Sequence, residues 1–267
     1  MAKREALELP EGFADPGLPT GTFSHSQYST YKKCGRAYEF QYVRRETKPS
    51  NGAMRRGVLI HKGVEHALRH KMQTGSLPTV DASLAAVREE HESYTEEVDW
   101  GDEPVTEVLS RTERALRTYY AHGLRTVNPI AVEQALVFKA GDVPIIGYID
   151  FVDQPIGDPM AWVVDLKTSA KKWSASQVAS NTQLTLYALG TGTTNVRIDN
   201  LVLKELSVEF QREEHVRSRR QLQVLTEDLQ EVASDIKKGR FPMTAIDSWA
   251  CNETWCPYWH QCRGRKS

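Results

Sequence analysis

An aspartate and a lysine stand two positions apart at the end of an apolar run, in the stretch VVDLKTS at residues 163–169. Val163 and Val164 have the character of a buried strand, and alternation then places Asp165 and Lys167 on one face of it. Charged residues rarely lie on a buried face without partners. The stretch therefore predicts either a buried ion pair, which the tripeptide alone favours, or an acid that binds a metal ion beside a lysine that acts on a phosphate.

A second acid, Asp150, ends the apolar stretch IIGYID in the segment before this strand. If the two segments pair as a meander, Asp150 and Asp165 meet at one end of the sheet. Two carboxylates beside a lysine suit a hard divalent cation such as Mg²⁺, which prefers oxygen ligands. Lys167 would then orient or help deprotonate a water molecule and offset negative charge on a phosphate.

A histidine on an earlier predicted helix extends this candidate site. His61 lies in GVLIHKGVEHAL, with Gly57 four residues before it and Glu65 four residues after it, so the three share one helix face. The glycine would allow close approach of the helix backbone. Histidine suits Mn²⁺ better than Mg²⁺. A packed or capping role on the helix accounts for a lone histidine as well.

The stretch QLTLYA places Gln183 and Tyr187 on one helix face, four residues apart. Both side chains can hydrogen-bond a phosphate or a base, and tyrosine can also stack on a base. A polar helix edge with Tyr187 in the core explains the pair equally well.

The chain has four cysteines, three of which lie within twelve residues of the C-terminal tail. They are Cys34, Cys251, Cys256 and Cys262. Disulfides are rare in a reducing cytosol. The crowding of three cysteines favours a shared metal site over scattered free thiols.

Sequence periodicity sets these residues on an α/β framework. Residues 1–22 carry three prolines and three glycines and are predicted to form an irregular arm. Helices are predicted at 24–43, 53–72, 81–98 and 104–123, strands at 131–140, 143–153 and 161–169, a helix at 174–190 that stops at Gly190, one or two strands within 196–210, and a helix at 218–239. Three strands followed by a crossover helix and another strand imply a sheet of mixed direction.

The chain has 34 lysines and arginines against 35 aspartates and glutamates, so its net charge is close to zero. Any nucleic-acid contact must therefore come from a local patch. The basic stretches MRRG at 54–57 and RSRR at 217–220 are candidates for tracking a phosphate backbone. No apolar stretch is long enough for a membrane helix, and the first residues lack an apolar signal core. We expect a cytoplasmic protein without a membrane partner.

Taken together, the motifs are Gly57-x-x-x-His61, Gly147-x-x-Asp150, Asp165-x-Lys167 and Gln183-x-x-x-Tyr187, in that order. With the four cysteines, this series resembles the PD-(D/E)XK nuclease superfamily, specifically its RecB-like exonuclease branch with an iron–sulfur cluster. That branch includes CRISPR-associated RecB-like nucleases and AddB-type nuclease domains. The resemblance covers roughly residues 24–264.

The resemblance implies a role for each matching residue. It implies a Mg²⁺ or Mn²⁺ ion bound by His61, Asp150, Asp165 and the carbonyl of Leu166, with Lys167, Asp165 and Asp150 as the catalytic residues. It also implies that Gln183 and Tyr187 position the substrate. Glu133, and Glu65 on the helix of His61, are expected to contact the metal ligands without binding the metal themselves.

The resemblance further implies a [4Fe–4S] cluster held by Cys34, Cys251, Cys256 and Cys262. Relatives often carry two of the C-terminal cysteines as C-x-x-C, whereas four residues separate the first pair here and five the second. This departure leaves Zn²⁺ open as the alternative metal at the four cysteines.

The implied fold is a restriction-endonuclease-like α/β core with a mixed central sheet flanked by helices. We expect a single nuclease domain over 23–267, with a helical part at 24–125, an αβββαβ-type core at 131–240, and a cysteine tail at 241–267 that packs with Cys34. The oligomeric state is not predicted.

The implied activity is metal-dependent hydrolysis of DNA phosphodiester bonds. We expect an exonuclease that prefers single strands or free ends and serves recombination, repair, or phage or CRISPR DNA processing, with recombination or CRISPR proteins as partners. The sequence lacks a G-x-x-x-x-G-K-[ST] phosphate loop, so any unwinding motor would be a separate protein. The alternatives are a non-catalytic DNA-binding or assembly factor with a metal-stapled fold, and a zinc-containing RNA-processing enzyme.

Overall fold

The computed structural model describes residues 7–46, 50–101 and 103–264. The chain forms two compact units. The first comprises Met1–Leu7, Pro49–Leu136 and Tyr148–Arg219, and the second comprises Glu8–Lys48, Val137–Gly147 and Arg220–Ser267. Residues 1–6 of the predicted arm and residues 265–267 of the predicted cysteine tail lie outside the described residues.

Three long helices form the helical part of the first unit: α3 (Gly52–Thr74), α4 (Val80–Glu92) and α5 (Val105–His122). Asn51 starts α3, because its side chain accepts a hydrogen bond from the N–H of Met54. Gly75 ends the helix with a φ of 79°, which glycine adopts without steric cost. These boundaries lie close to the predicted 53–72.

The helix predicted at 81–98 is shorter in the structure. It ends at Glu92, and Val98–Asp99 instead forms the short strand β2, which pairs in parallel with β1 (Ser50–Asn51). A further single turn of 3-10 helix, η2 (Leu124–Thr126), follows α5.

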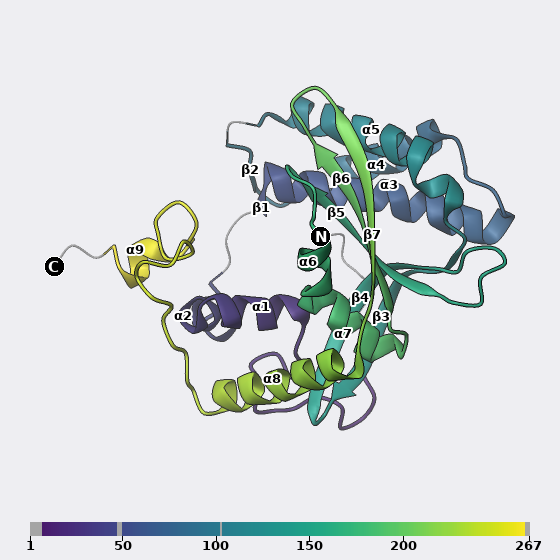
Figure 1. The fold of residues 1–267 in the computed structure, drawn as a ribbon. Coiled ribbons are helices and arrows are strands. Elements are labelled where there is room, and N and C mark those ends of the chain that lie inside the picture. The colour runs from purple at the N-terminus through teal and green to yellow at the C-terminus, as the bar shows by residue number, and fades with distance from the viewer. Residues whose placement is uncertain (1–6, 47–49, 102, 265–267) are drawn as a thin grey trace. The chain divides into compact units, whose positions relative to one another are not determined.

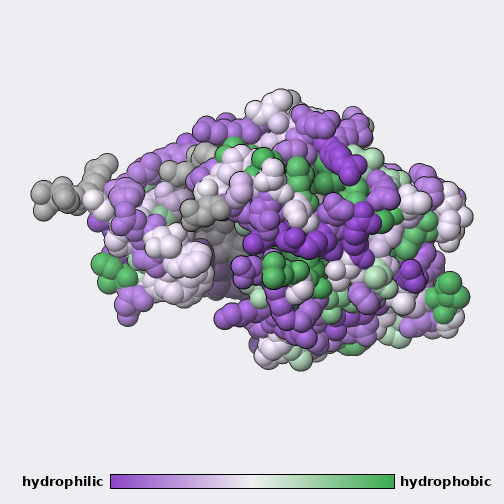
Figure 2. Space-filling view, turned by 90° about the horizontal axis from the view of Figure 1, so that it is seen from above, coloured by the Kyte–Doolittle hydropathy of each residue, from purple (hydrophilic) through white to green (hydrophobic). Residues whose placement is uncertain are grey.

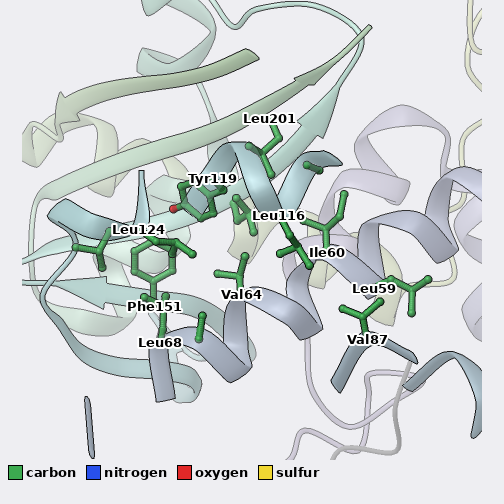
Figure 3. Packing of buried hydrophobic residues seen from close by; sticks show 14 of the residues in the cluster. Leu59, Ile60, Val64, Leu68, Val87, Leu116, Tyr119, Leu124, Phe151 and Leu201 are labelled. Carbon is green, nitrogen blue, oxygen red and sulfur yellow. The ribbon is translucent and has the colours of Figure 1, made fainter. Parts of the chain in front are cut away.

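The apolar core of the first unit lies between these helices and the sheet. Figure 3 shows side chains of α3 and α5 meeting there, with Leu59, Ile60, Val64 and Leu68 from α3 and Leu116 and Tyr119 from α5. Strand residues such as Phe151 and Leu201 complete the cluster and are fully buried. Burial of this apolar surface is the main force that fixes α3 against the sheet.

The sheet has five strands in the order β3-β4-β5-β6-β7. They are β3 (Pro129–Ala140), β4 (Val143–Asp153), β5 (Trp162–Ser169), β6 (Asn195–Leu203) and β7 (Val208–Val216). The pairs β4–β5 and β6–β7 are antiparallel, whereas β5 and β6 are parallel. The sheet is therefore mixed, as predicted, and the end of the β3–β4 hairpin belongs to the second unit.

The two faces of β5 have different surroundings. Val164 and Leu166 join the apolar cluster that contains α3 and α5. Alternation turns Asp165 and Lys167 the other way, and Lys167 there contacts Gln183 of helix α7 (Thr182–Thr191). Figure 1 shows helices on both faces of the sheet within this unit. The fold is thus the predicted α/β core with a mixed sheet flanked by helices.

The crossover between β5 and β6 contains two helices, not the one predicted at 174–190. They are α6 (Ala175–Ala179) and α7 (Thr182–Thr191). The helical conformation is interrupted at Ser180. Asn181 then starts the second helix, because its side chain accepts a hydrogen bond from the N–H of Leu184. The helix ends at Gly192, whose φ is 74°, and not at Gly190. An asparagine within an apparently continuous helix was the signal for this break.

The helices of the second unit are α1 (His25–Lys33), α2 (Gly35–Tyr38), the π-helix η1 (Glu39–Val43), α8 (Arg219–Lys237, which starts at the last residue of the first unit) and α9 (Trp259–Cys262). Ser24 begins α1 as predicted, since its side chain accepts a hydrogen bond from the N–H of Gln27. The single helix predicted at 24–43 is interrupted at Cys34, whose backbone is extended with φ −166° and ψ 113°.

Hydrophilic residues predominate on the face of the molecule drawn in Figure 2, where hydrophobic residues form small separate groups. Within the described residues, none of the helices combines the length and apolarity needed to span a bilayer.

Candidate active site

Asp165 and Lys167 form the ion pair that their spacing predicts. Lys167 Nζ lies 2.7 Å from Asp165 Oδ2, and Asp165 is 1% exposed. Burial alone would lower the pKa of Lys167, but the negative charges of Asp165 and Asp150 outweigh it and raise the pKa. Burial and the nearby charge of Asp150 raise the pKa of Asp165, against the effect of Lys167. The lysine is therefore a cation held beside a buried acid.

Asp150 contacts the backbone of the neighbouring strand. The strands β4 and β5 are paired from Asp153↔Trp162 to Phe151↔Val164. Beyond that point, Asp150 Oδ2 accepts a hydrogen bond of 2.6 Å from the backbone N–H of Leu166. Burial acts to raise the pKa of Asp150, but His61, Lys167 and this N–H group together lower it. Asp150 is thus held as an anion at the place where the strands separate.

His61 on α3 faces the same peptide segment. Its Nδ1 atom lies 3.2 Å from Asp150 Oδ1, and its Nε2 atom lies 3.0 Å from the carbonyl oxygen of Leu166. Burial would lower the pKa of His61, but the charges of Asp150, Glu133 and Asp165 raise it to about 9. Both ring nitrogens face acceptors, so the protonated imidazole can donate to both.

Gly57 does not have the predicted role of permitting close backbone approach. A Cβ atom at this position would have Thr168 Oγ1, 4.0 Å away, as its nearest neighbour. That separation is an ordinary van der Waals contact, so the packing here has room for an alanine.

Glu133 on β3 lies closer to the centre of the site than sequence reasoning suggested. One ligand atom from each of His61, Glu133 and Asp150 lies within 4.8 Å of the others. Glu133 has a φ of 49°, a conformation that non-glycine residues rarely adopt, particularly within a strand. We attribute the position of its carboxylate, beside the histidine, to this local distortion of β3. No sequence pattern signalled the distortion.

Glu65 is engaged elsewhere, on the surface of α3. Its carboxylate lies 2.8 Å from Arg69 Nε and 3.3 Å from Lys62 Nζ. These charges lower its pKa although burial opposes them. Glu65 does not belong to the group formed by His61, Glu133 and Asp150.

Gln183 and Tyr187 hold the lysine. Lys167 Nζ donates a 2.9 Å hydrogen bond to Gln183 Oε1, and Gln183 Nε2 donates a 2.6 Å hydrogen bond to the Tyr187 hydroxyl. Tyr187 is 5% exposed, and burial, with the nearby acids, raises its pKa. Tyr187, Gln183, Lys167 and Asp165 are therefore linked by successive contacts, which the i, i+4 spacing of Gln183 and Tyr187 on α7 makes possible.

The donor set suits a hard divalent cation. The imidazole of His61 and the carboxylates of Asp150 and Glu133 converge. The Leu166 carbonyl contacts the ring nitrogen of His61 that faces away from Asp150, and the carboxylate of Asp165 is nearby. Oxygen-rich sites of this kind bind Mg²⁺, and one imidazole is compatible with Mn²⁺.

The basic stretches suggested for tracking a phosphate backbone are largely engaged within the first unit. Arg55 is 2% exposed and forms an ion pair of 3.0 Å with Glu90. Arg56 pairs with Glu103. Arg217 is also 2% exposed and donates to backbone carbonyls. Three of these arginines therefore support the fold, and the suggestion is wrong for them.

The four cysteines line one cavity of the second unit, with a volume of about 170 Å³. Cys34 reaches it from the break between α1 and α2, and Cys262 from the end of α9. None of the four is in a disulfide. Burial, with the neighbouring Cys34 and Cys256, raises the pKa of the Cys262 thiol. Ring stacking of Phe40 on Tyr258, with centroids 5.1 Å apart, fixes the tail beside the cavity.

Comparison with known proteins agrees with the fold. A model of the PD-(D/E)XK nuclease superfamily matches residues 22–263. The chain therefore belongs to the PD-(D/E)XK nuclease superfamily.

Solved structures include one described as "Putative exonuclease" from Eubacterium rectale, with a TM-score of 0.53 and 13% sequence identity, covering 92% of this chain and 93% of that one. At this level of identity, the similarity shows a shared fold. A second, SSO0001, has a TM-score of 0.36 and 12% identity over 78% of this chain and 86% of that one. A search of curated proteins gave no match.

Proposed function

We propose that this chain is a metal-dependent deoxyribonuclease that hydrolyses phosphodiester bonds. The observation that carries the proposal is the convergence of His61, Asp150 and Glu133 beside the Asp165–Lys167 pair in a chain of the PD-(D/E)XK superfamily. A set of metal donors next to a fixed cation is what hydrolysis of a phosphate ester requires.

In this proposal, His61, Asp150, Asp165 and the Leu166 carbonyl hold Mg²⁺ or Mn²⁺, and Glu133 joins them. A bound ion would supply a Lewis acid and lower the pKa of a water molecule. The chain's own residues hold the donors in place and exclude solvent from Asp165, which is 1% exposed.

Lys167 is assigned the role of a cation. Its ammonium group lies 2.7 Å from Asp165, where it can orient or help deprotonate a water molecule and stabilise charge on the phosphate. Gln183 keeps the ammonium group oriented, and Tyr187 fixes Gln183.

The proposed substrate is DNA with single-stranded character or free ends, cleaved from an end. Membership of the superfamily supports a nuclease, and the described exonuclease with a similar fold supports the preference for ends. Recombination, repair, or phage or CRISPR DNA processing, with the corresponding partner proteins, is the proposed setting.

We also propose that Cys34, Cys251, Cys256 and Cys262 hold a [4Fe–4S] cluster. A tetrahedral Zn²⁺ site with Zn–S bonds of about 2.3 Å would bring the sulfur atoms to about 3.8 Å from one another. Within the described residues, no three of these sulfur atoms all lie within 4.8 Å of one another. A wider group of thiols around a cavity of about 170 Å³ favours a cluster over a single zinc ion.

The experiment is a substrate panel with the purified, metal-loaded protein. Linear single-stranded DNA, blunt duplex DNA, circular single-stranded DNA and RNA are each incubated with Mg²⁺, Mn²⁺ or EDTA. The proposal predicts metal-dependent shortening of linear DNA, with circular DNA and RNA intact. Metal-dependent DNA binding without cleavage of any substrate would instead establish the non-catalytic binding factor, and cleavage of RNA alone the RNA-processing enzyme.

A further inference from the structure

Arg217 is a buried arginine at the carboxyl end of β7. Its backbone N–H donates to the carbonyl of Thr194 at 2.8 Å, which fixes the main chain at this point. The residue is 2% exposed. Burial lowers the pKa of its guanidinium to about 10, so the group still carries its charge at neutral pH. A buried charge without compensating contacts would be strongly destabilising.

The compensation comes from carbonyl oxygens of the α6–α7 break. Its NH1 nitrogen donates to Ala179 at 2.9 Å, and its NH2 nitrogen donates to Val178 at 2.8 Å and to Asn181 at 3.0 Å. NH1 also lies 2.8 Å from Nδ1 of His215. Burial and the charge of Arg217 lower the pKa of His215, which leaves this nitrogen able to accept.

These carbonyls stand where α6 ends and α7 begins. Val178 and Ala179 belong to the last turn of α6, and the Val178 carbonyl also accepts a 3.2 Å hydrogen bond from the N–H of Asn181. Asn181 is the residue whose side chain starts α7. A planar guanidinium with several donors can hold such a group of oxygens, whereas a lysine ammonium cannot match its geometry. Arg217 therefore fixes both the bend and the starting point of α7.

Gln183 lies in the first turn of α7, two residues after Asn181. Any shift in the start of this helix moves Gln183 Oε1, which accepts the 2.9 Å hydrogen bond from Lys167 Nζ. We propose that Arg217 is a positioning residue for the reaction: its contacts with the α6–α7 break set the place of Gln183 and, through it, of Lys167. This inference rests on the proposed nuclease function.

The test is a double-mutant cycle on DNA cleavage with Arg217→Lys and Gln183→Ala. Because Arg217 acts through Gln183, R217K should lower kcat by ~10- to 100-fold with little change in KM, as expected for a misplaced reacting group. The double variant should be no slower than Q183A alone. Arg240→Lys is the matched control, since Arg240 has a side chain 66% exposed and should tolerate the change.

Hydrogen exchange of the same variants supplies a readout independent of cleavage. R217K should raise deuterium uptake over residues 175–187 and leave α3 and α5 unchanged. If R217K does not fold, Asn181→Ala takes its place in the cycle. This variant removes the side-chain cap of α7 at the residue whose carbonyl Arg217 contacts.

Full activity of R217K, or effects of R217K and Q183A that multiply, would overturn the inference while leaving the nuclease function in place. An inactive wild-type protein would overturn the proposed function. The hydrogen exchange would then still decide whether Arg217 holds α7, and unchanged uptake over 175–187 would refute that.

Discussion

The carboxylate of Asp150 accepts a hydrogen bond from the backbone N–H of Leu166 at 2.6 Å, at the point where β4 and β5 stop pairing. The carbonyl of the same Leu166 lies 3.0 Å from His61 Nε2, and His61 Nδ1 lies 3.2 Å from Asp150. The N–H and the carbonyl of Leu166, which belong to adjacent peptide groups, are thus held by an acid and a histidine that also contact each other. The chain itself therefore fixes these candidate metal donors.

This relationship separates two roles of Asp150 that substitutions can distinguish. Asp150→Asn keeps an oxygen that can accept from Leu166, so we expect near-normal stability but Mn²⁺ affinity at least about tenfold weaker. Asp150→Ala leaves the buried N–H without a partner and should cost a further ~1–3 kcal/mol of unfolding free energy. Calorimetric titration and thermal denaturation measure the two effects. Equal destabilisation by both variants would contradict the backbone role.

Tyr187→Phe tests whether the hydrogen bond between Tyr187 and Gln183 helps to position Lys167. The variant keeps the buried ring but removes the hydroxyl that accepts a hydrogen bond from Gln183 at 2.6 Å. We expect kcat to fall about tenfold with unchanged KM and a loss of ~1 kcal/mol in stability. Tyr120→Phe, which removes a hydroxyl 2.6 Å from that of Ser83 on α4, is the control. Unchanged kcat in Tyr187→Phe would show that Gln183 is positioned without it.

His61 links metal binding to pH. Its pKa is raised from 6.5 to about 9 in the metal-free protein, chiefly by Asp150 acting against burial. Because the folded-state pKa is the higher one, the proton stabilises the metal-free fold below about pH 6.5, and this contribution disappears as the pH rises through about 9.

A metal ligand must be deprotonated, so Mn²⁺ should displace this proton. Affinity should then rise with pH up to about 9 and level off above it. Calorimetry at pH 7.5 in buffers of different ionisation enthalpy should detect release of close to one proton per ion, and His61→Gln should abolish it. Binding without proton release would exclude His61 as a ligand.

The cysteine cavity gives a prediction about stability. Cys262→Ser should reduce iron and acid-labile sulfide content and lower the melting temperature, because the proposed cluster would link the tail to the segment around Cys34. Met243→Leu is the matched control, since Met243 Sδ lies 3.8 Å from Cys262 Sγ and lines the same cavity. Zinc in place of iron in protein purified without oxygen would contradict the cluster assignment.

The residues of the sheet and α7 were predictable because their patterns are local. Two positions along a strand put Asp165 and Lys167 on one face, and four positions along a helix put Gln183 and Tyr187 together. The contact between Lys167 and Gln183 spans sixteen residues and was not predicted, since the family resemblance implied only that Gln183 positions the substrate.

The remaining features depend on packing that no short pattern records. Glu133 is at the site with a positive φ in the middle of a strand, where periodicity predicts an ordinary alternation. Cys34 interrupts a predicted helix, and Gly35, directly after it, is a weak helix former that sequence reasoning passed over. Arg217 was grouped with basic surface residues because burial of an arginine is decided by distant carbonyls, in this case those of Val178 and Asn181.

The central claim is that the Asp165–Lys167 pair lies at the catalytic centre of a nuclease. The most direct measurement follows end-labelled single-stranded DNA with Mn²⁺, comparing wild type with Lys167→Met and Asp165→Asn at equal, verified folding. We expect cleavage by the wild type that EDTA abolishes, and a fall of at least ~10²–10³-fold in kcat for each variant. Cleavage by purified Lys167→Met at the wild-type rate would contradict it.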